Sequence, residues 1–280
     1  MKKRLILICS ALLLALAVWV LWGNTALEVN EYTVTDSNLP SSFDGFRIAQ
    51  ISDLHNDEFG ENNETLLELL QKSEPDIIVI TGDLADAYDT DIDIALRFAE
   101  QAVTVAPCYY VAGNHESSIV EYDALRAGLE ALGITVLENE RLELERNGEA
   151  VTVIGLDDPS FRADPFLGNS ASVVAEAMED LVYGNSYTIL LSHRPEFFDI
   201  YAENGIDLVF SGHAHGGQFR LPFVGGLFAP GQGLFPEYDS GLYTQGATTM
   251  VVSRGIGNSI FPLRFNNRPE IIVVTLRAQE

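Results

Sequence analysis

Residues 76–86 read Asp-Ile-Ile-Val-Ile-Thr-Gly-Asp-Leu-Ala-Asp, an apolar segment that ends at Gly82-Asp83. The apolar part is β-branched and too short for a helix, so it predicts a buried strand. The same arrangement recurs in the strands predicted at 46–52, 108–112, 187–191 and 207–210, each followed closely by Asp, Asn or His. Helical patterns fall at 61–72, 91–105, 120–132 and 171–181. This alternation predicts an α/β fold.

Further strands are predicted nearer the C-terminus. Residues 141–154 are typical of a hairpin with its turn at Asn147-Gly148, and two more strands are expected at 248–253 and 271–276. The chain of 280 residues with 47% hydrophobic content is long enough to bury one large core. We therefore expect one main globular domain.

The polar residues that follow the strands form five motifs, which together contain all five histidines of the chain. In order, the motifs are Asp53-Leu54-His55, Gly82-Asp83-Leu84-Ala85-Asp86, Gly113-Asn114-His115-Glu116, Ser192-His193 and Gly212-His213-Ala214-His215. Loops at the carboxyl ends of strands converge on one crevice in α/β folds, so the motifs are expected to meet. Imidazole mixed with carboxylate suits Zn, Mn and Fe better than Mg or Ca. The sequence therefore predicts a metal site.

Most of these motifs also have an ordinary structural interpretation when taken alone. Asp53 and His55 can cap a helix, Gly82-Asp83 is common turn chemistry, and an isolated His193 can be a satisfied core residue. Two histidines at positions i and i+2 behind a glycine, as in the last motif, are seldom core residues. The ordered series at strand ends favours the metal site over scattered packing roles.

Charge and cysteine content exclude some classes of protein. The net charge is -25, from 41 acidic and 16 basic residues, which argues against nucleic-acid binding because that needs a basic face. The two cysteines, Cys9 and Cys108, form neither a disulfide framework nor a Cys-x-x-Cys motif. No protein partner can be inferred from the sequence.

The N-terminus contains a candidate membrane segment. Lys2, Lys3 and Arg4 precede a mostly aliphatic run from Leu5 to Trp22, which as a helix would span about 27 Å. The basic cluster is expected to stay cytoplasmic, which places the body outside the cell membrane as a single-pass protein. The alternative is a signal segment that is cleaved on secretion, although no clean small-x-small site follows it.

The motif series resembles that of the calcineurin-like metallophosphoesterase superfamily. The stretch from Gly212 to Gln218, followed by Phe219-Arg220-Leu221-Pro222, resembles together with the N-terminal anchor its bacterial membrane-associated phosphodiesterase branch. The resemblance covers about residues 45–277. It implies a four-layer αββα sandwich of two mixed β-sheets flanked by helices. With the anchor, the expected division is 1–23 for the transmembrane or signal segment, 24–44 for a tether and first strand, and 45–280 for the metallophosphoesterase domain.

The resemblance also implies roles for individual residues. One metal would be held by Asp53, His55 and His215, the other by Asn114, His193 and His213, with Asp83 bridging the two. His115 would be the catalytic histidine, oriented by Asp86. The cofactors would be two divalent or trivalent ions drawn from Mn, Fe and Zn.

This arrangement predicts a phosphodiesterase in which a hydroxide shared by the two metals attacks the phosphate ester. The apolar stretch 222–233 indicates a lip that meets lipid, or otherwise an ordinary packed loop. Arg254 and Arg264 are candidate phosphate-binding residues, or otherwise surface or ion-paired arginines. The predicted substrate is a phospholipid-like or lipid-linked phosphate ester. The alternatives are a phosphomonoesterase or protein phosphatase on the same scaffold, and a binding protein without catalysis.

Overall fold

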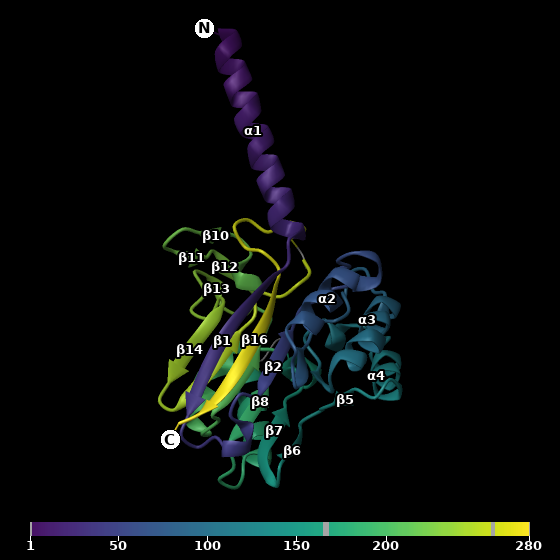
Figure 1. The fold of residues 1–280 in the computed structure, drawn as a ribbon, viewed down its shortest axis with the longest axis vertical. Coiled ribbons are helices and arrows are strands. Elements are labelled where there is room, and N and C mark those ends of the chain that lie inside the picture. Colours follow the sequence, from purple (N-terminus) through teal and green to yellow (C-terminus); the bar gives the residue numbers. More distant parts are fainter. Residues whose placement is uncertain (1, 165–167, 259–260, 280) are drawn as a thin grey trace.

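The fold is built on two six-stranded mixed sheets (Figure 1). The computed structural model describes residues 2–164, 168–258 and 261–279. The predicted transmembrane or signal segment begins at Met1, and the predicted metallophosphoesterase domain ends at Glu280. Both of these residues lie outside the described range. The first sheet has the order β1 (Glu28–Asp36), β16 (Glu270–Ala278), β2 (Arg47–Ile51), β3 (Ile77–Thr81), β4 (Cys108–Val111) and β5 (Thr135–Val136). Its strands run parallel except where β16 meets β2.

The second sheet is also mixed. Its order is β14 (Gly241–Gln245), β15 (Thr248–Val252), β9 (Leu208–Ser211), β8 (Thr188–Leu191), β7 (Glu149–Gly155) and β6 (Glu140–Arg146). The strands from β15 to β7 are parallel, and the two edge strands are antiparallel to their neighbours. The predicted hairpin at Asn147-Gly148 is the β6–β7 pair.

The hydrophobic core has three parts that separate four layers. Ile48 and Val79 of the first sheet pack against Ile189 and Phe210 of the second in the central part. One outer part lies between the first sheet and the helices α2 (Glu64–Lys72), α3 (Ile92–Val105) and α4 (Tyr122–Ala131). The other lies between the second sheet and the helices α5 (Ser170–Leu181) and α6 (Phe198–Glu203). The predicted sandwich of two mixed sheets flanked by helices is confirmed.

Some short elements differ from the predictions. The helix expected at 61–72 begins only at Glu64, because Asn62 and Asn63 have φ angles of 52° and 63° that interrupt it. The sequence did not predict α6, β5 or β14, which are six, two and five residues long. The two residues of β5 and the fewer than two helical turns of α6 contain too little of an apolar pattern to be recognised, and β14 (Gly-Leu-Tyr-Thr-Gln) lacks the continuous apolar run of the predicted strands. Two small hairpins, β10 (Arg220–Leu221) with β11 (Gly225–Gly226) and β12 (Phe228–Ala229) with β13 (Gly233–Leu234), were also missed.

The predicted N-terminal segment is the helix α1 (Lys2–Thr25), which rises away from the body (Figure 1). It is long and apolar enough to cross a membrane, a test that a signal sequence also passes. Only Ala26 and Leu27 separate α1 from β1. The Asn24 side chain donates to the Arg264 carbonyl (2.9 Å) and accepts from the Arg264 N–H (2.6 Å). The last turn of α1 is thus fixed to the body.

The remaining helical segments are single 3-10 turns, at Ser41–Phe43, Glu61–Asn63, Glu116–Ser118, Pro159–Phe161, Pro195–Phe197 and His215–Gly217.

Candidate metal centre

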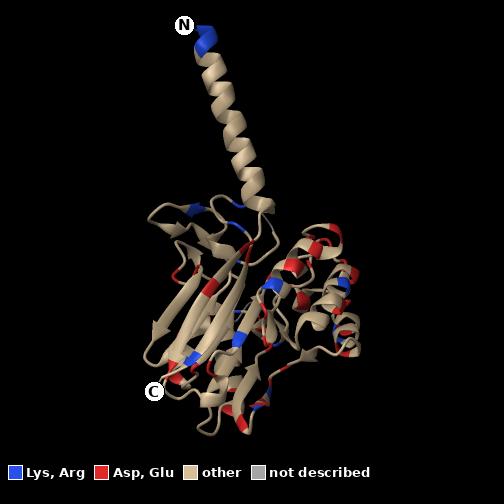
Figure 2. Cartoon of the chain, in the orientation of Figure 1, with Lys and Arg blue, Asp and Glu red and all other residues tan. Residues whose placement is uncertain are grey.

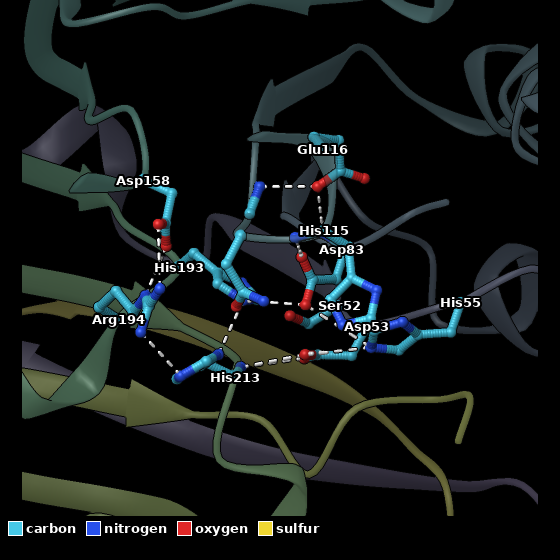
Figure 3. A network of polar contacts seen from close by, with 12 residues as sticks. Ser52, Asp53, His55, Asp83, His115, Glu116, Asp158, His193, Arg194 and His213 are labelled. Atoms are coloured by element: carbon cyan, nitrogen blue, oxygen red, sulfur yellow. Dashed lines mark hydrogen bonds and ion pairs between the residues drawn. The ribbon is translucent and has the colours of Figure 1, made fainter. Parts of the chain in front are cut away.

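The predicted site residues follow the carboxyl ends of five strands, as the sequence indicated. Asp53 and His55 follow β2, Asp83 follows β3, and Asn114 follows β4 in the first sheet. His193 follows β8 and His213 follows β9 in the second sheet. Because both sheets end at the same place, they bring residues far apart in the sequence into one polar network (Figure 3).

One group of ligand-type side chains consists of Asp53, His55 and His215. One ligand atom from each lies within 4.8 Å of those of the others. Nε2 of His55 is 3.2 Å from Nε2 of His215, which is in turn 3.4 Å from Oδ1 of Asp53. All three side chains are buried.

A second group consists of Asp83, His193 and His213, and its ligand atoms also lie within 4.8 Å of one another. Nε2 of His193 is 3.2 Å from both Oδ1 of Asn114 and Nδ1 of His213. Oδ1 of Asp83 accepts the backbone N–H of His115 (2.9 Å). Its Oδ2 lies between the groups, 3.1 Å from Nε2 of His193 and 3.6 Å from Nε2 of His55.

The protonation of these residues fits metal ligation. Nδ1 of His193 lies 2.7 Å from the Thr81 carbonyl, an acceptor that fixes its proton there and turns Nε2 toward the group. Burial lowers the pKa of His213 and His215 well below the ordinary value, which keeps both imidazoles neutral. Burial opposes the charged form of His193, but Asp83 outweighs it and raises this pKa to about 10. A cation in place of that proton would satisfy the same carboxylate.

Five of the predicted ligands have left-handed backbone conformations. The φ angles are 53° at Asp53, 47° at His55, 54° at Asp83, 63° at His213 and 46° at His215. A non-glycine residue in this region costs about 1–3 kcal/mol and persists only where its surroundings enforce it. Such strain is typical of functional sites.

Close packing of the strand-end loops explains the glycines in the motifs. A Cβ at Gly212 would lie 1.9 Å from Oγ of Ser52, and one at Gly82 would lie 2.7 Å from Nδ1 of His193. Gly82 also has a φ of 88°, which disfavours any side chain. These glycines let the loops of the two sheets approach each other.

His115 and Asp86 lie beside the first group. Nδ1 of His115 accepts the Ala87 N–H (2.9 Å) and is 3.5 Å from Oδ2 of Asp86. The same Oδ2 is 3.3 Å from Nδ1 of His55, so Asp86 contacts both imidazoles. Burial lowers the pKa of His115. His55, Asp86 and His115 also gather their ligand atoms within 4.8 Å, but this group shares His55 with the first.

The two candidate phosphate-binding arginines both have partners within the protein. Arg254 forms ion pairs with Glu28 and with Glu270, the latter at 2.7 Å. Arg264 is 1% exposed and donates to the carbonyls of Arg254 and Gly257. Arg254 thus matches the ion-paired alternative, and phosphate binding by Arg254 or Arg264 stays a prediction.

Two further polar groups support the site, and sequence reasoning assigned no role to either. The buried Glu116 carboxylate accepts the N–H groups of Asp83 (2.9 Å), Ala85 (3.1 Å) and Gly113 (2.8 Å), which ties two motif loops together. Glu116 is the last residue of the motif that begins at Gly113, so its position in the sequence could have indicated a role in the site.

The second supporting group is the pair of Arg194 and Asp158. Arg194 donates to both carboxylate oxygens of Asp158, at 2.5 and 3.0 Å, and its Nη1 is 3.0 Å from Nε2 of His213 (Figure 3). The one sequence feature that could have indicated a role for Arg194 is its position directly after His193. Asp158 is distant in sequence from every motif and gave no signal.

Comparison with known proteins agrees with this geometry. The sequence model of the calcineurin-like phosphoesterase family matches residues 46–217.

The chain belongs to this family.

One relative is the uncharacterized metallophosphoesterase YkuE of Bacillus subtilis, which is 33% identical over 90% of this chain and 86% of its own length. Phosphodiesterase YaeI of Escherichia coli is 29% identical over 82% of each chain. The crystal structure of TT1561 of Thermus thermophilus shares the fold with a TM-score of 0.51, at 15% identity over 75% of this chain and 90% of that chain.

Membership in the calcineurin-like phosphoesterase family and the clustered His and Asp side chains make the protein a metal-dependent phosphoester hydrolase. The expectation of an enzyme of this class is confirmed. The identity of the metals and the role of each ligand stay predictions.

Proposed function

We propose that the protein is a membrane-anchored phosphodiesterase that hydrolyses phospholipid-like or lipid-linked phosphate esters. The observation that carries this proposal is the position of Asp83, whose Oδ2 contacts His193 and His55 in the two ligand groups. A carboxylate between two sets of imidazoles suits a pair of neighbouring cations, which would take the place of the protons that Asp83 favours on His193 and His55. Two cations suit phosphate esters, which carry negative charge into the transition state.

The proposed ligands are divided between two ions. Asp53, His55 and His215 would hold one ion, Asn114, His193 and His213 the other, and Asp83 would contact both. When bound, Mn, Fe or Zn ions in this arrangement supply an acidified water and positive charge near the phosphoryl oxygens. Asn114 contributes an oxygen without adding negative charge.

His115 is the proposed proton donor to the leaving alkoxide. Its Nδ1 accepts the Ala87 N–H, which leaves the proton of the neutral ring on Nε2. Asp86 lies beside the ring and favours the imidazolium, whereas burial opposes it. A polar cavity of about 570 Å³, lined by His55, Asp86 and Tyr88 among others, adjoins the site and offers room for the ester.

The membrane assignment is supported by a short path from α1 to the site. Asn24, in the last turn of α1, forms two hydrogen bonds with the backbone of Arg264. Nη2 of Arg264 lies 3.5 Å from Nδ1 of the predicted ligand His215. A single arginine side chain therefore separates the end of the candidate membrane helix from the metal site. The basic residues at the start of α1 favour an extracytoplasmic body.

The reaction is tested with the full-length protein reconstituted in vesicles and supplied with Mn²⁺. We expect faster turnover of bis-p-nitrophenyl phosphate than of p-nitrophenyl phosphate, and loss of both activities when the metal is chelated. Faster hydrolysis of the monoester would instead favour a phosphomonoesterase. Phospholipids and lipid-linked diphosphates are then compared with the soluble diester as substrates in the same vesicles.

A further inference from the structure

Exposed apolar side chains outside α1 are concentrated in the two small hairpins. Within the described residues, Leu221, Phe223, Val224, Phe228, Leu234 and Phe235 are at least 40% exposed. We call these six side chains the apolar rim. The neighbouring loop adds Phe261 and Leu263, and the rest of the described body has only Tyr88, Val120, Tyr183 and Leu242. A group of this kind marks an interaction surface rather than random exposure.

The two hairpins that contain most of the apolar rim, β10–β11 and β12–β13, lie beside the base of α1 (Figure 1). The ring of Trp19 packs edge-on against Phe265, with 5.3 Å between centroids. The carbonyl of Phe265 accepts the N–H of Arg220 (2.9 Å), the first residue of β10. Trp19 is about 9 Å from Thr25 along the helix axis, at 1.5 Å per residue. The body therefore contacts α1 within its apolar part, and not only at its end.

The charges near the apolar rim differ from those of the rest of the chain. Residues 219–236 and 254–268 contain four arginines and no acidic residue, whereas the whole chain has 41 acidic and 16 basic residues. Figure 2 shows many of the acidic residues on the helices α2 to α4 instead.

These arginines do not make the surface strongly basic. Arg220 pairs with Asp239 (3.1 Å), while Arg254 and Arg268 both pair with Glu28. The surface is therefore close to neutral, which suits contact with a bilayer better than binding of a polyanion.

We propose that the apolar rim inserts into the interfacial layer of the bilayer that α1 spans, with Phe223 at its deepest point. Phe223 lies between β10 and β11 and is fully exposed. Phe and Leu side chains insert at the boundary between headgroups and acyl chains. Trp favours the level of the lipid headgroups, and Trp19 and Trp22 of α1 are at the same end of the molecule. The partner is thus the lipid surface itself. This inference rests on the membrane anchoring in the proposed function, but not on the reaction.

Site-directed spin labelling of the full-length chain tests the insertion. Cys9 is replaced by Ala, Cys108 is buried, and a label is placed at Phe223→Cys in vesicles of phosphatidylcholine and phosphatidylglycerol. The matched control is Val120→Cys, because Val120 is 93% exposed and lies outside the apolar rim. We expect several-fold fewer collisions with an aqueous nickel chelate at position 223 than at position 120, and more collisions with oxygen. Circular dichroism spectra that match that of the unlabelled chain verify that both labelled chains are folded.

Each other outcome counts against the proposal in a distinct way. Equal nickel collisions at both positions would show that the apolar rim stays in water. Spin–spin broadening at position 223 that disappears on dilution with unlabelled chain would show that a second copy covers the rim. Extraction of the chain from vesicles by alkaline carbonate would refute the anchoring, and the insertion with it. Hydrolysis of the soluble diester is measured separately, so failure of the proposed reaction is distinguishable from all three.

Discussion

Residues 46–217 and residues 218–268 make different contributions to this molecule. The first region matches the family model and contains every predicted metal ligand, all buried except the half-buried Asn114. The second region lies outside that match and contains the apolar rim and the contacts with α1. On the proposed function, the first region would determine the reaction and the second would determine where the reaction takes place. Substitutions in each region should then have separable effects.

The largest loss of turnover is expected when Asp83 is substituted. Asp83→Asn removes the charge between the two ligand groups and should lower diester turnover by at least about 10³-fold. Retention in vesicles should be unchanged, because Asp83 itself forms no hydrogen bond or ion pair with α1 among the described residues. Metal content and turnover are measured together, with the exposed Asp123→Asn as the matched control. Retained turnover would exclude the bridging role.

The second largest loss of turnover is expected when His115 is substituted. His115→Ala should lower turnover by about 10²- to 10⁴-fold, the usual range for loss of a general acid or base. Both metals should remain bound, as checked by elemental analysis of the purified protein. Loss of one metal would mean that His115 is itself a ligand, an outcome that its closeness to His55 makes worth testing.

A smaller effect is expected from the pair that supports His213. Arg194→Gln and Asp158→Asn should each lower turnover or metal affinity by about 10- to 100-fold, because both act by positioning a ligand. The double substitution should cost little more than either one, since the two side chains form one unit. Mn²⁺ titration of each variant measures the effect. Additive losses would show that Arg194 acts independently of Asp158.

The second region is tested by substitutions in the apolar rim. Phe223→Asp combined with Phe235→Asp should lower turnover of a lipid ester in vesicles several-fold and leave the soluble diester unaffected. Val120→Asp is the control for an added charge at an exposed apolar position. Equal losses on both substrates would contradict the separation between the two regions.

The smallest effect is expected at Asp157 and concerns the free energy of unfolding, not turnover. Asp157 lies in the first region, outside the metal site. Burial and the nearby Glu138 raise its pKa to about 6, so the folded state binds a proton more tightly than the unfolded state does. Its contribution to stability is present in acid and is lost as the pH rises toward 6. Asp157→Asn should therefore stabilise the protein at pH 7 by about 1 kcal/mol and not at pH 4. Denaturant unfolding at the two pH values measures this.

The sequence predicted the first region better than the second for physical reasons. Strands such as Ile77–Thr81 are short, apolar and followed at once by ligand-type residues. The sequence therefore indicates both that the segment is a strand and where it ends. Arg254 and Arg264 illustrate the limit, because nothing local shows that Glu28, Glu270 or a backbone carbonyl will occupy their guanidinium groups. Asp158 was missed for the same reason, since its partner Arg194 is 36 residues away.

The contact between Asn24 and Arg264 has a consequence for how the enzyme meets its substrate. With only Ala26 and Leu27 between α1 and β1, the catalytic body cannot swing on a flexible arm. If α1 spans the bilayer, the active centre stays at a constant height above the lipid and sweeps the surface only by lateral diffusion. Encounters would then be a search in two dimensions, so their rate would depend on the density of substrate in the leaflet and not on its bulk concentration.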